Sequence, residues 1–194
     1  MIHVGASTGQ ERDLYAGKDL AVAWVEPLPD VFQQLQEATS TYPKQKCFNY
    51  LVTDKDDKEY PFYVSSNEGH SSSILPLSAH REVWPEVHYV RNLLLKSITL
   101  PSLIRKERLD LNLYEALVLD TQGSELLILT GAIDVLPSFK FIQCEAADFE
   151  AYVGCCRVSQ VDAFLAEAGF RRLVKKCFAK SKLGNYYDVL YGRR

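Results

Sequence analysis

The sequence lacks long apolar runs and lacks a surplus of positive charge. None of its apolar runs approaches the roughly 20 residues that a membrane-spanning helix needs. Its 25 Asp and Glu residues outnumber its 22 Lys and Arg residues, for a net charge of -3. Proteins that bind nucleic acids usually carry a basic surplus that pairs with phosphates. We therefore expect a protein that neither spans a membrane nor binds nucleic acid.

Cysteine is scarce, and its spacing does not suit a metal or redox site. Of the five cysteines, Cys155 and Cys156 are adjacent, which fits neither a zinc knuckle nor a redox C-x-x-C pair. The sequence also opens without the charged and apolar segments of a secretory signal. We therefore expect reduced, mostly buried thiols in a cytoplasmic protein.

The apolar pattern predicts an α/β fold. With 47% hydrophobic and 24% charged residues, the 194 residues are enough for one domain with a single core. Short apolar runs alternate with helical patterns, which is typical of a parallel sheet with crossover helices. The expected strands are residues 2–4, 21–25, 48–52, 116–119, 139–144, 171–175 and 186–191. Helices are expected after residues 27–29, over residues 124–136, and from Ser159 to a C-cap at Gly169, with Ser159 and Asp162 approximating a capping box.

The interval from about residue 53 to residue 115 breaks this alternation. It holds a charged turn at residues 54–58, a weakly alternating edge strand at 60–64, and a polar loop at 65–73. Long polar loops in compact domains are usually functional or disordered. We therefore expect residues 1–194 to form a single domain in which residues 53–115 are a substrate-loop insertion near the binding face.

A turn with two glycines follows the first expected strand. Gly5 and Gly9 allow the backbone to approach a ligand closely. Glu26 ends the second apolar strand, 21 residues after Gly5, where an acidic side chain can accept hydrogen bonds from both ribose hydroxyls of a nucleoside. A G-x-G-x-x-G fingerprint would need glycines where the chain has Ser7 and Gln10. The two features together predict a nucleoside site that fits NAD poorly.

A second polar run directly follows the expected strand at residues 116–119. It begins with Asp120, Gln122 and Gly123 and ends with Glu125 in the first turn of a helix. An acidic residue there commonly caps the helix. Two carboxylates and an amide within six residues at the carboxyl end of a strand exceed what capping needs, and so the pattern favours a functional site.

These motifs together resemble the FkbM-type methyltransferases, and the resemblance covers nearly the whole chain. Its most specific element is the Asp-x-Gln-Gly-(Ser/Ala)-Glu run with a Gly-Ala pair downstream. The matching segments, in order, are residues 4–10 (VGASTGQ), 25–27 (VEP), 69–75 (GHSSSIL), 119–126 (LDTQGSEL), 131–132 (GA), 142–145 (IQCE), 168–170 (AGF) and the last strand with Asp188.

The resemblance implies a class I methyltransferase fold and an enzymatic activity. The expected fold is a doubly wound, Rossmann-like, mostly parallel seven-stranded sheet whose last strand is antiparallel. The implied cofactor is S-adenosyl-L-methionine, and the implied reaction is O-methylation of a hydroxyl on a sugar or secondary metabolite. The expected partner is thus a small-molecule acceptor, and the oligomeric state stays open.

The resemblance also assigns residues to the cofactor site. Gly5, Ala6 and Gly9 would hold the methionine part, Glu26 the ribose, and Asp54 the edge of the adenine. Asp120 and Gln122 would lie beside the sulfonium and the acceptor. His3 occupies a position where the family often has Asp. The full expected set is His3, Gly5, Ala6, Ser7, Gly9, Glu26, Pro27, Asp54, Asp120 and Gln122.

Methylation of a hydroxyl requires a base that takes its proton. His70 is the first candidate because it lies in the polar loop and its type titrates near neutral pH. Asp120, Glu125 and Glu145 are the rivals. Asp120 or Glu125 could also bind a divalent cation, but no histidine stands at clear ligand spacing, and so no metal is expected.

A non-catalytic module that keeps this fold and binds a nucleoside or a partner is the alternative to an enzyme. The position of His3 and the absence of a helical segment before the first strand favour the module. The intact run from Asp120 to Glu125 favours the enzyme.

Overall fold

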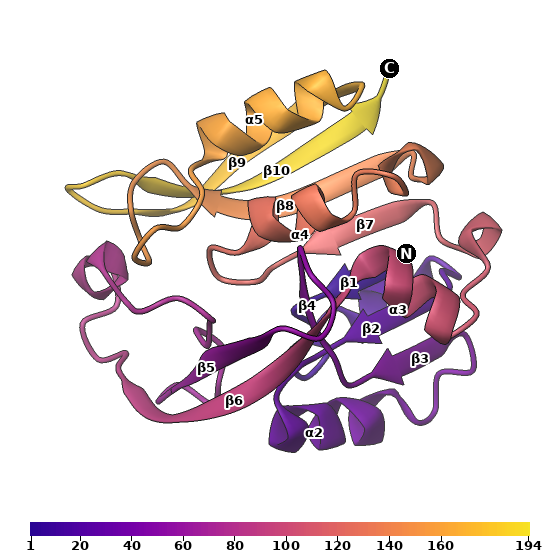
Figure 1. Cartoon of the computed structure of the whole chain (residues 1–194), viewed down its shortest axis with the longest axis horizontal. Coiled ribbons are helices and arrows are strands. Elements are labelled where there is room, and N and C mark those ends of the chain that lie inside the picture. The colour runs from indigo at the N-terminus through magenta and orange to yellow at the C-terminus, as the bar shows by residue number, and fades with distance from the viewer.

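The computed structural model describes residues 1–194, and a seven-stranded sheet forms its centre (Figure 1). The strand order is β3-β2-β1-β7-β8-β10-β9. Strands β1, β2, β3, β7 and β8 run parallel, and β10 is antiparallel to both of its neighbours. The predicted doubly wound, mostly parallel seven-stranded sheet with an antiparallel last strand is thereby confirmed. The bounds are β1 Ile2–Val4, β2 Val22–Val25, β3 Gln45–Phe48, β7 Ala116–Leu119, β8 Phe141–Ala147, β9 Phe170–Lys180 and β10 Asn185–Arg193.

Helices pack on both faces of this sheet, as a doubly wound fold requires. Side chains alternate along a strand, so that Ile2 and Val4 of β1 join the main core while His3 points to the opposite face. The main core contains residues of α3, α4 and α5, and a smaller cluster packs Leu35 of α2 on Trp24. The helices are α1 Arg12–Gly17, α2 Pro29–Thr39, α3 Leu100–Lys106, α4 Glu125–Gly131 and α5 Val158–Glu167, with 3-10 turns η1 Ala79–Glu82, η2 Leu111–Leu113 and η3 Leu136–Ser138. No helix has the length and apolar character to cross a bilayer.

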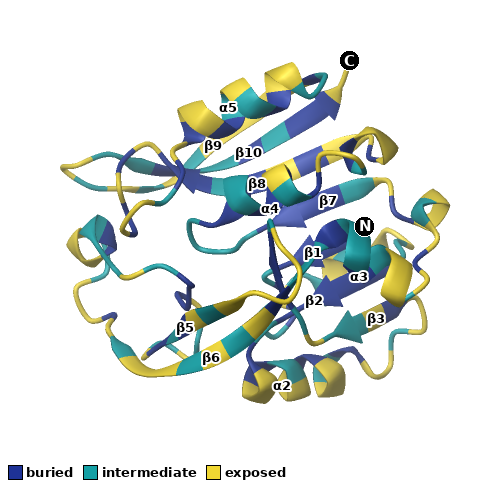
Figure 2. Ribbon diagram, in the orientation of Figure 1, coloured by how far each residue is buried: buried dark blue, intermediate teal, exposed yellow.

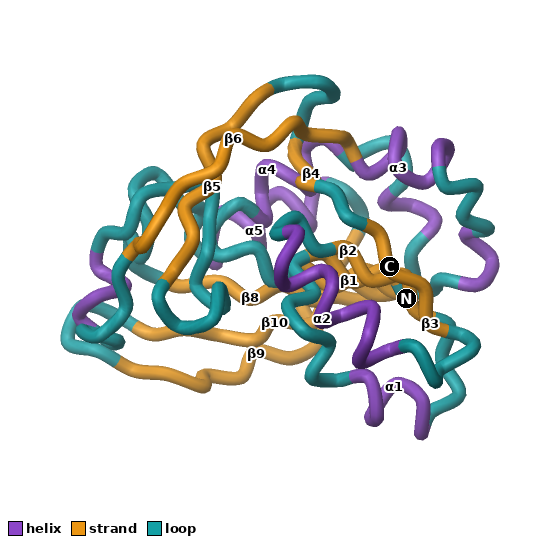
Figure 3. The backbone as a smooth tube through the Cα atoms, turned by 90° about the horizontal axis from the view of Figure 1, so that it is seen from below, coloured by secondary structure: helices purple, strands orange, loops and turns teal.

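A second, three-stranded sheet is built from the interval that breaks the sequence pattern. Its order is β4-β6-β5, with β4 Leu51–Thr53 parallel and β5 Glu59–Ser65 antiparallel to β6 Tyr89–Thr99. Seen from below, β5 and β6 form a layer apart from the strands of the large sheet (Figure 3). Phe62 and Ile74 pack with Leu28 and Val31 of the α2 region. The small sheet is thereby fixed beside the carboxyl ends of β1 and β2.

The strand predicted at residues 48–52 is wrong, because the chain turns away from the large sheet there. β3 ends at Phe48 and β4 begins at Leu51 in the small sheet. Between them the Asn49 side chain donates to the carbonyl oxygens of Glu26 (2.8 Å) and Pro27 (3.1 Å). These bonds satisfy the backbone carbonyl oxygens that follow β2, and they direct the chain out of the large sheet.

Two helix predictions also need correction. The helix predicted over residues 124–136 ends at Gly131 and is followed by the separate turn η3, where Pro137 disfavours helical backbone at the residue before it. The last helix starts at Val158, and its first turn is closed by Gln160, which accepts from the Arg157 amide at 2.8 Å. The predicted capping residue Asp162 instead pairs with Arg172 across the surface.

Candidate functional site

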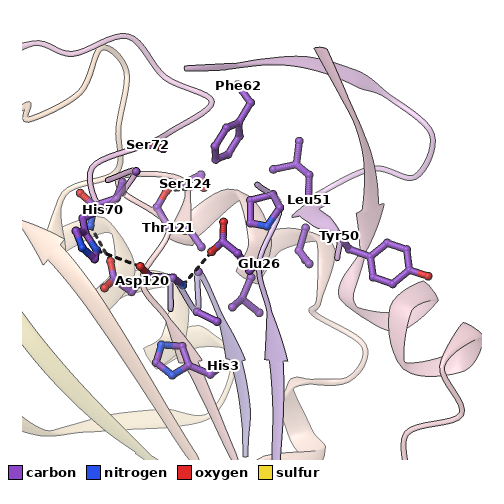
Figure 4. A pocket seen from close by; sticks show the side chains of 18 of the residues that line it. His3, Glu26, Tyr50, Leu51, Phe62, His70, Ser72, Asp120, Thr121 and Ser124 are labelled. Atoms are coloured by element: carbon purple, nitrogen blue, oxygen red, sulfur yellow. Dashed lines mark hydrogen bonds between the residues drawn. The ribbon is translucent and has the colours of Figure 1, made fainter. Parts of the chain in front are cut away.

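A cavity of about 360 Å³ opens at the carboxyl ends of β1, β2 and β7. This volume lies within the range of small-ligand sites, about 300–1,000 Å³. Strands β1 and β2 are buried along their length, and β7 is buried from Leu117 to Leu119 (Figure 2). Phe62 of β5 also lines the cavity, as do His70 and Ser72 of the polar loop that follows β5 (Figure 4). The cavity therefore lies where a doubly wound sheet places its ligand.

The turn after β1 forms one side of the cavity and is tightly held. The amides of Gly5 and Ala6 both donate to the carbonyl oxygen of Val25, at 3.0 and 3.1 Å. Gly5 has a φ of +82°, and a Cβ added there would overlap the carbonyl oxygen of Asp120. Gly5, Ala6 and Ser7 line the cavity, whereas Gly9 packs outside it, against Leu35 of α2.

Glu26 lies at the end of β2 with its side chain directed into the cavity (Figure 4). Its two carboxylate oxygens accept from the amides of Ser7 and Leu28, each at 2.9 Å. The side chain is 5% exposed. Burial raises the pKa of Glu26 to about 7, and the charge of Asp120 acts in the same direction. Each oxygen keeps a lone pair for a further donor, and so Glu26 can bind two neighbouring hydroxyls. Pro27 follows it in the cavity wall.

Asp120 and Gln122 form the opposite wall, directly after β7. The Gln122 side-chain nitrogen donates to Asp120 Oδ1 at 2.7 Å and to Glu145 Oε1 at 3.3 Å. Burial raises the pKa of Asp120 to about 7, and the negative charges of Glu125, Glu11 and Asp188 add to this. A half-buried carboxyl with a pKa near neutral is suited to accept a proton at physiological pH.

Glu125 lies beneath this wall and does not reach the cavity. Its Oε1 accepts from the amides of Thr121 (2.9 Å) and Gly123 (3.1 Å), and Cys156 Sγ lies 3.5 Å from Oε2. The side chain is 1% exposed. The structure thus places this predicted catalytic residue beneath the cavity wall, where its carboxylate accepts from the amides of the turn between β7 and α4 and holds the turn that carries Asp120.

His70 lies at the rim of the cavity, above the turn after β1 (Figure 4). Its Nδ1 is 3.0 Å from Ser7 Oγ and 3.4 Å from Gln10 Nε2, and its Nε2 is 4.0 Å from the carboxylate of Glu68. Polar side chains of residues 65–72 form hydrogen bonds with one another and with backbone amides, and these bonds order the loop that carries His70. His70 therefore joins the polar loop to the turn after β1 and closes one side of the cavity.

Two further predicted cofactor residues take different positions. His3 lines the cavity beneath the turn and packs against Tyr15 and Trp24, and burial lowers its pKa to about 4. It is therefore neutral at pH 7. Asp54 lies outside the cavity, where it accepts from Tyr60 Oη at 3.1 Å.

The part of the wall that Asp54 was expected to occupy is apolar. It is lined by Leu51, Val52 and Phe62. Sequence reasoning missed these residues, although the alternation along residues 60–64 could have indicated Phe62 as an inward-facing position. A flat apolar group fits this surface better than a charged one.

The comparison with protein families decides the relationship. The model of the methyltransferase FkbM domain matches residues 3–172. The chain belongs to the FkbM methyltransferase family. No curated protein matches the sequence.

Solved structures with low sequence identity share the fold of this FkbM chain. Magnesium protoporphyrin IX methyltransferase from Synechocystis PCC 6803, solved with SAM bound, superposes with a TM-score of 0.56 at 8% identity, covering 100% of this chain and 69% of that one. Sp1610 of Streptococcus pneumoniae, proposed to be a tRNA (m1A22) methyltransferase, gives 0.55 at 8% identity, with 99% and 62% covered. The FkbM chain thus spans about two thirds of the length of these neighbours.

The buried carboxyl of Glu26 makes the stability of the FkbM chain depend on pH. Because its pKa is raised from 4.5 to about 7, the folded state binds this proton more tightly than the unfolded state, and the stabilisation is present below pH 4.5 and lost as pH rises through 7. His3 and His80, whose pKa values are lowered from 6.5 to about 4, act with the opposite sign, and so the prediction concerns a difference between variants.

Between pH 8 and pH 5, we expect wild type to gain about 2–3 kcal/mol in free energy of unfolding relative to Glu26→Gln. Urea unfolding of both proteins at pH 5, 6, 7 and 8 measures this difference. A difference that does not change with pH, or that shrinks towards pH 5, would contradict the burial of this carboxyl.

Proposed function

We propose that the chain binds S-adenosylmethionine in the cavity between Glu26 and Asp120 and transfers its methyl group to a hydroxyl of a small, uncharged, polyhydroxylated acceptor such as a sugar or glycoside. The observation that carries the proposal is the buried carboxylate of Glu26, which has free lone pairs towards the cavity and no ion-pair partner. A ribose diol supplies two donors at the spacing of one carboxylate.

The residues of the cavity fit this cofactor. The turn at Gly5 lies against the backbone of Asp120 with no space for a side chain, which brings the two walls of the cavity within reach of one ligand. Leu51 and Phe62 offer an apolar surface for an adenine ring. When bound, the cofactor supplies a methyl group on a positively charged sulfur, and the acceptor oxygen displaces that sulfur, which keeps the electron pair.

The charge of the cavity favours a cationic cofactor over a dinucleotide. Its lining contains the acidic side chains of Glu11, Glu26 and Asp120, and it contains neither Lys nor Arg. A sulfonium is attracted by these charges, whereas a pyrophosphate would be repelled. The same reasoning disfavours phosphorylated acceptors and nucleic acid, which supports an uncharged acceptor.

Asp120 is the residue to which we assign the proton of the acceptor hydroxyl. It is held by Gln122 in the cavity wall, and its pKa of about 7 lets it act at neutral pH. The Nδ1 of His70 already contacts Ser7 and Gln10. We assign His70 to the closure of the rim over the bound cofactor and acceptor.

Ligand-induced stabilisation tests the proposal. S-adenosylhomocysteine at about 100 times its dissociation constant should add about 2.7 kcal/mol to the stability of the native state, which corresponds to roughly 5–10 °C in Tm. NAD should give no shift. Glu26→Gln should lose most of the stabilisation at the same ligand concentration, since it removes a charged acceptor of the ribose hydroxyls.

Glu115→Gln is the matched control, because Glu115 is an exposed residue beside the amino-terminal end of β7 and pairs with Lys140. It should keep the full shift. An equal shift with NAD, or a full shift in Glu26→Gln, would contradict the proposed site.

A further inference from the structure

The side chain of Gln122 is fixed by a residue that does not line the cavity. Tyr152, in the segment between β8 and α5, donates from its hydroxyl to Gln122 Oε1 at 2.6 Å. Tyr152 is 1% exposed. Since the amide oxygen is engaged by a donor, the amide nitrogen must face the other way, towards Asp120 and Glu145.

The backbone of Gln122 is fixed as well. Its φ is +54°, a left-handed conformation that is unfavourable for residues other than glycine by about 1–2 kcal/mol. Its carbonyl oxygen accepts from Ser73 Oγ at 2.8 Å. A glycine would adopt this φ without cost, and a Gln at the position is explained by the three hydrogen bonds of its side chain.

The nitrogen of Gln122 is shared by two carboxyl groups that stand on neighbouring strands. Asp120 follows β7, and Glu145 lies on β8, which pairs with β7. Further groups face the pair: Glu125 from α4, Asp188 and Tyr186 from β10, and Glu11 from the turn before α1. Lys176 pairs in register with Asp188, and its positive charge favours the ionised form of that carboxyl. Burial and these like charges raise the pKa of both Asp120 and Glu145.

We propose that Tyr152 and Glu145 are positioning residues that act through Gln122, so that one amide N–H remains directed at Asp120 while the acceptor proton is transferred. The proposal rests on the proposed function only in naming Asp120 as the base. Tyr152 sets the direction of the amide, and Glu145 accepts from its second N–H group, which leaves the first for Asp120. Together they set the proton affinity of Asp120 without contacting cofactor or acceptor.

Two substitutions should move the titration of Asp120 in opposite directions. Tyr152→Phe frees the amide to turn, weakens a hydrogen bond that favours the charged carboxylate, and should raise the midpoint by about one pH unit. Glu145→Gln removes the carboxyl with which Asp120 titrates as a pair, so that Asp120 should lose its proton in one step with a lower midpoint. A loss of packing alone would not produce shifts of opposite sign.

The titration is measured by 13C NMR of the side-chain carboxyl groups in the ligand-free protein, with resonances assigned through Asp120→Asn and Glu145→Gln. Tyr186→Phe is the matched control, because Tyr186 belongs to the same aromatic cluster but its hydroxyl bonds to His80 Nδ1 at 2.7 Å. It should leave the Asp120 midpoint unchanged. An unchanged midpoint in Tyr152→Phe, or a raised one in Glu145→Gln, would overturn the proposal.

Binding of S-adenosylhomocysteine to the same variants separates this proposal from the proposed function. Tyr152 and Glu145 do not line the cavity, and so both variants should bind with an affinity within about threefold of wild type. If wild type itself does not bind, the proposed function fails while the titration still decides the role of Tyr152. If Tyr152→Phe does not fold, Glu145→Gln alone decides the proposal by the direction of its shift.

Discussion

Asp120→Asn is expected to lower the rate of methyl transfer by about 10²–10⁴-fold, the usual contribution of a positioned general base. The substitution keeps the shape of the side chain and removes its ability to take a proton. Affinity for S-adenosylhomocysteine, whose sulfur is neutral, should stay close to wild type, whereas affinity for the cationic S-adenosylmethionine should fall several-fold. The expected result is therefore a loss of turnover with retained cofactor binding.

The measurement is transfer of a labelled methyl group from S-adenosylmethionine to an acceptor found by screening sugars and glycosides. Asp54→Asn is the control, because Asp54 resembles a cofactor residue in sequence but lies outside the cavity. It should keep near-normal turnover. Full activity in Asp120→Asn together with a large loss in His70→Ala would contradict the assignment and make His70 the base.

The same experiment separates an enzyme from a binding module. Wild type that binds S-adenosylhomocysteine but methylates no acceptor would favour the module. The cavity wall built around Asp120 and Gln122 argues for the enzyme, since nucleoside binding alone requires only the side with Gly5 and Glu26.

Gly5→Ala is expected to destabilise the fold by about 4 kcal/mol, a cost outside the usual range of point substitutions. Two effects combine at this position. Its φ of +82° is strained for alanine, and the new Cβ would overlap the carbonyl oxygen of Asp120 on the neighbouring strand. Because that oxygen belongs to backbone, the strands β1 and β7 would have to separate at the cavity.

Two other glycines separate the cost of the positive φ from the cost of the steric overlap. Gly154 has a φ of +72° with nothing near an added Cβ, and so Gly154→Ala should cost only about 1–2 kcal/mol. Gly17, at the end of α1, has neither restriction, and Gly17→Ala should be neutral or stabilising. Urea unfolding of the three variants gives the series. A cost in Gly5→Ala no larger than in Gly154→Ala would show that the close approach of β1 and β7 is wrong.

The large sheet and the position of Glu26 were predictable from sequence because both depend on local patterns. Continuous apolar runs mark buried parallel strands, and carboxyl ends of parallel strands meet at one edge. Glu26 and Asp120 were therefore expected to face the same crevice, and the structure brings them to one cavity.

Other features depend on contacts that sequence spacing does not reveal. Glu125 was predicted to be catalytic, whereas the fold directs its carboxylate to the amides of Thr121 and Gly123 in the turn before α4. The bend between β3 and β4 depends on Asn49, whose partners lie over 20 residues away. Tyr152 reaches Gln122 across 30 residues, and no motif marks it.

The most direct test of the account is isothermal titration of S-adenosylhomocysteine into wild type, Glu26→Gln and Glu115→Gln at pH 8, where Glu26 is ionised. We predict one site per chain, binding that is about 10–100-fold weaker in Glu26→Gln, and no change in Glu115→Gln. No binding to folded wild type, or equal affinity in Glu26→Gln, would contradict the claim that this cavity holds the cofactor through Glu26.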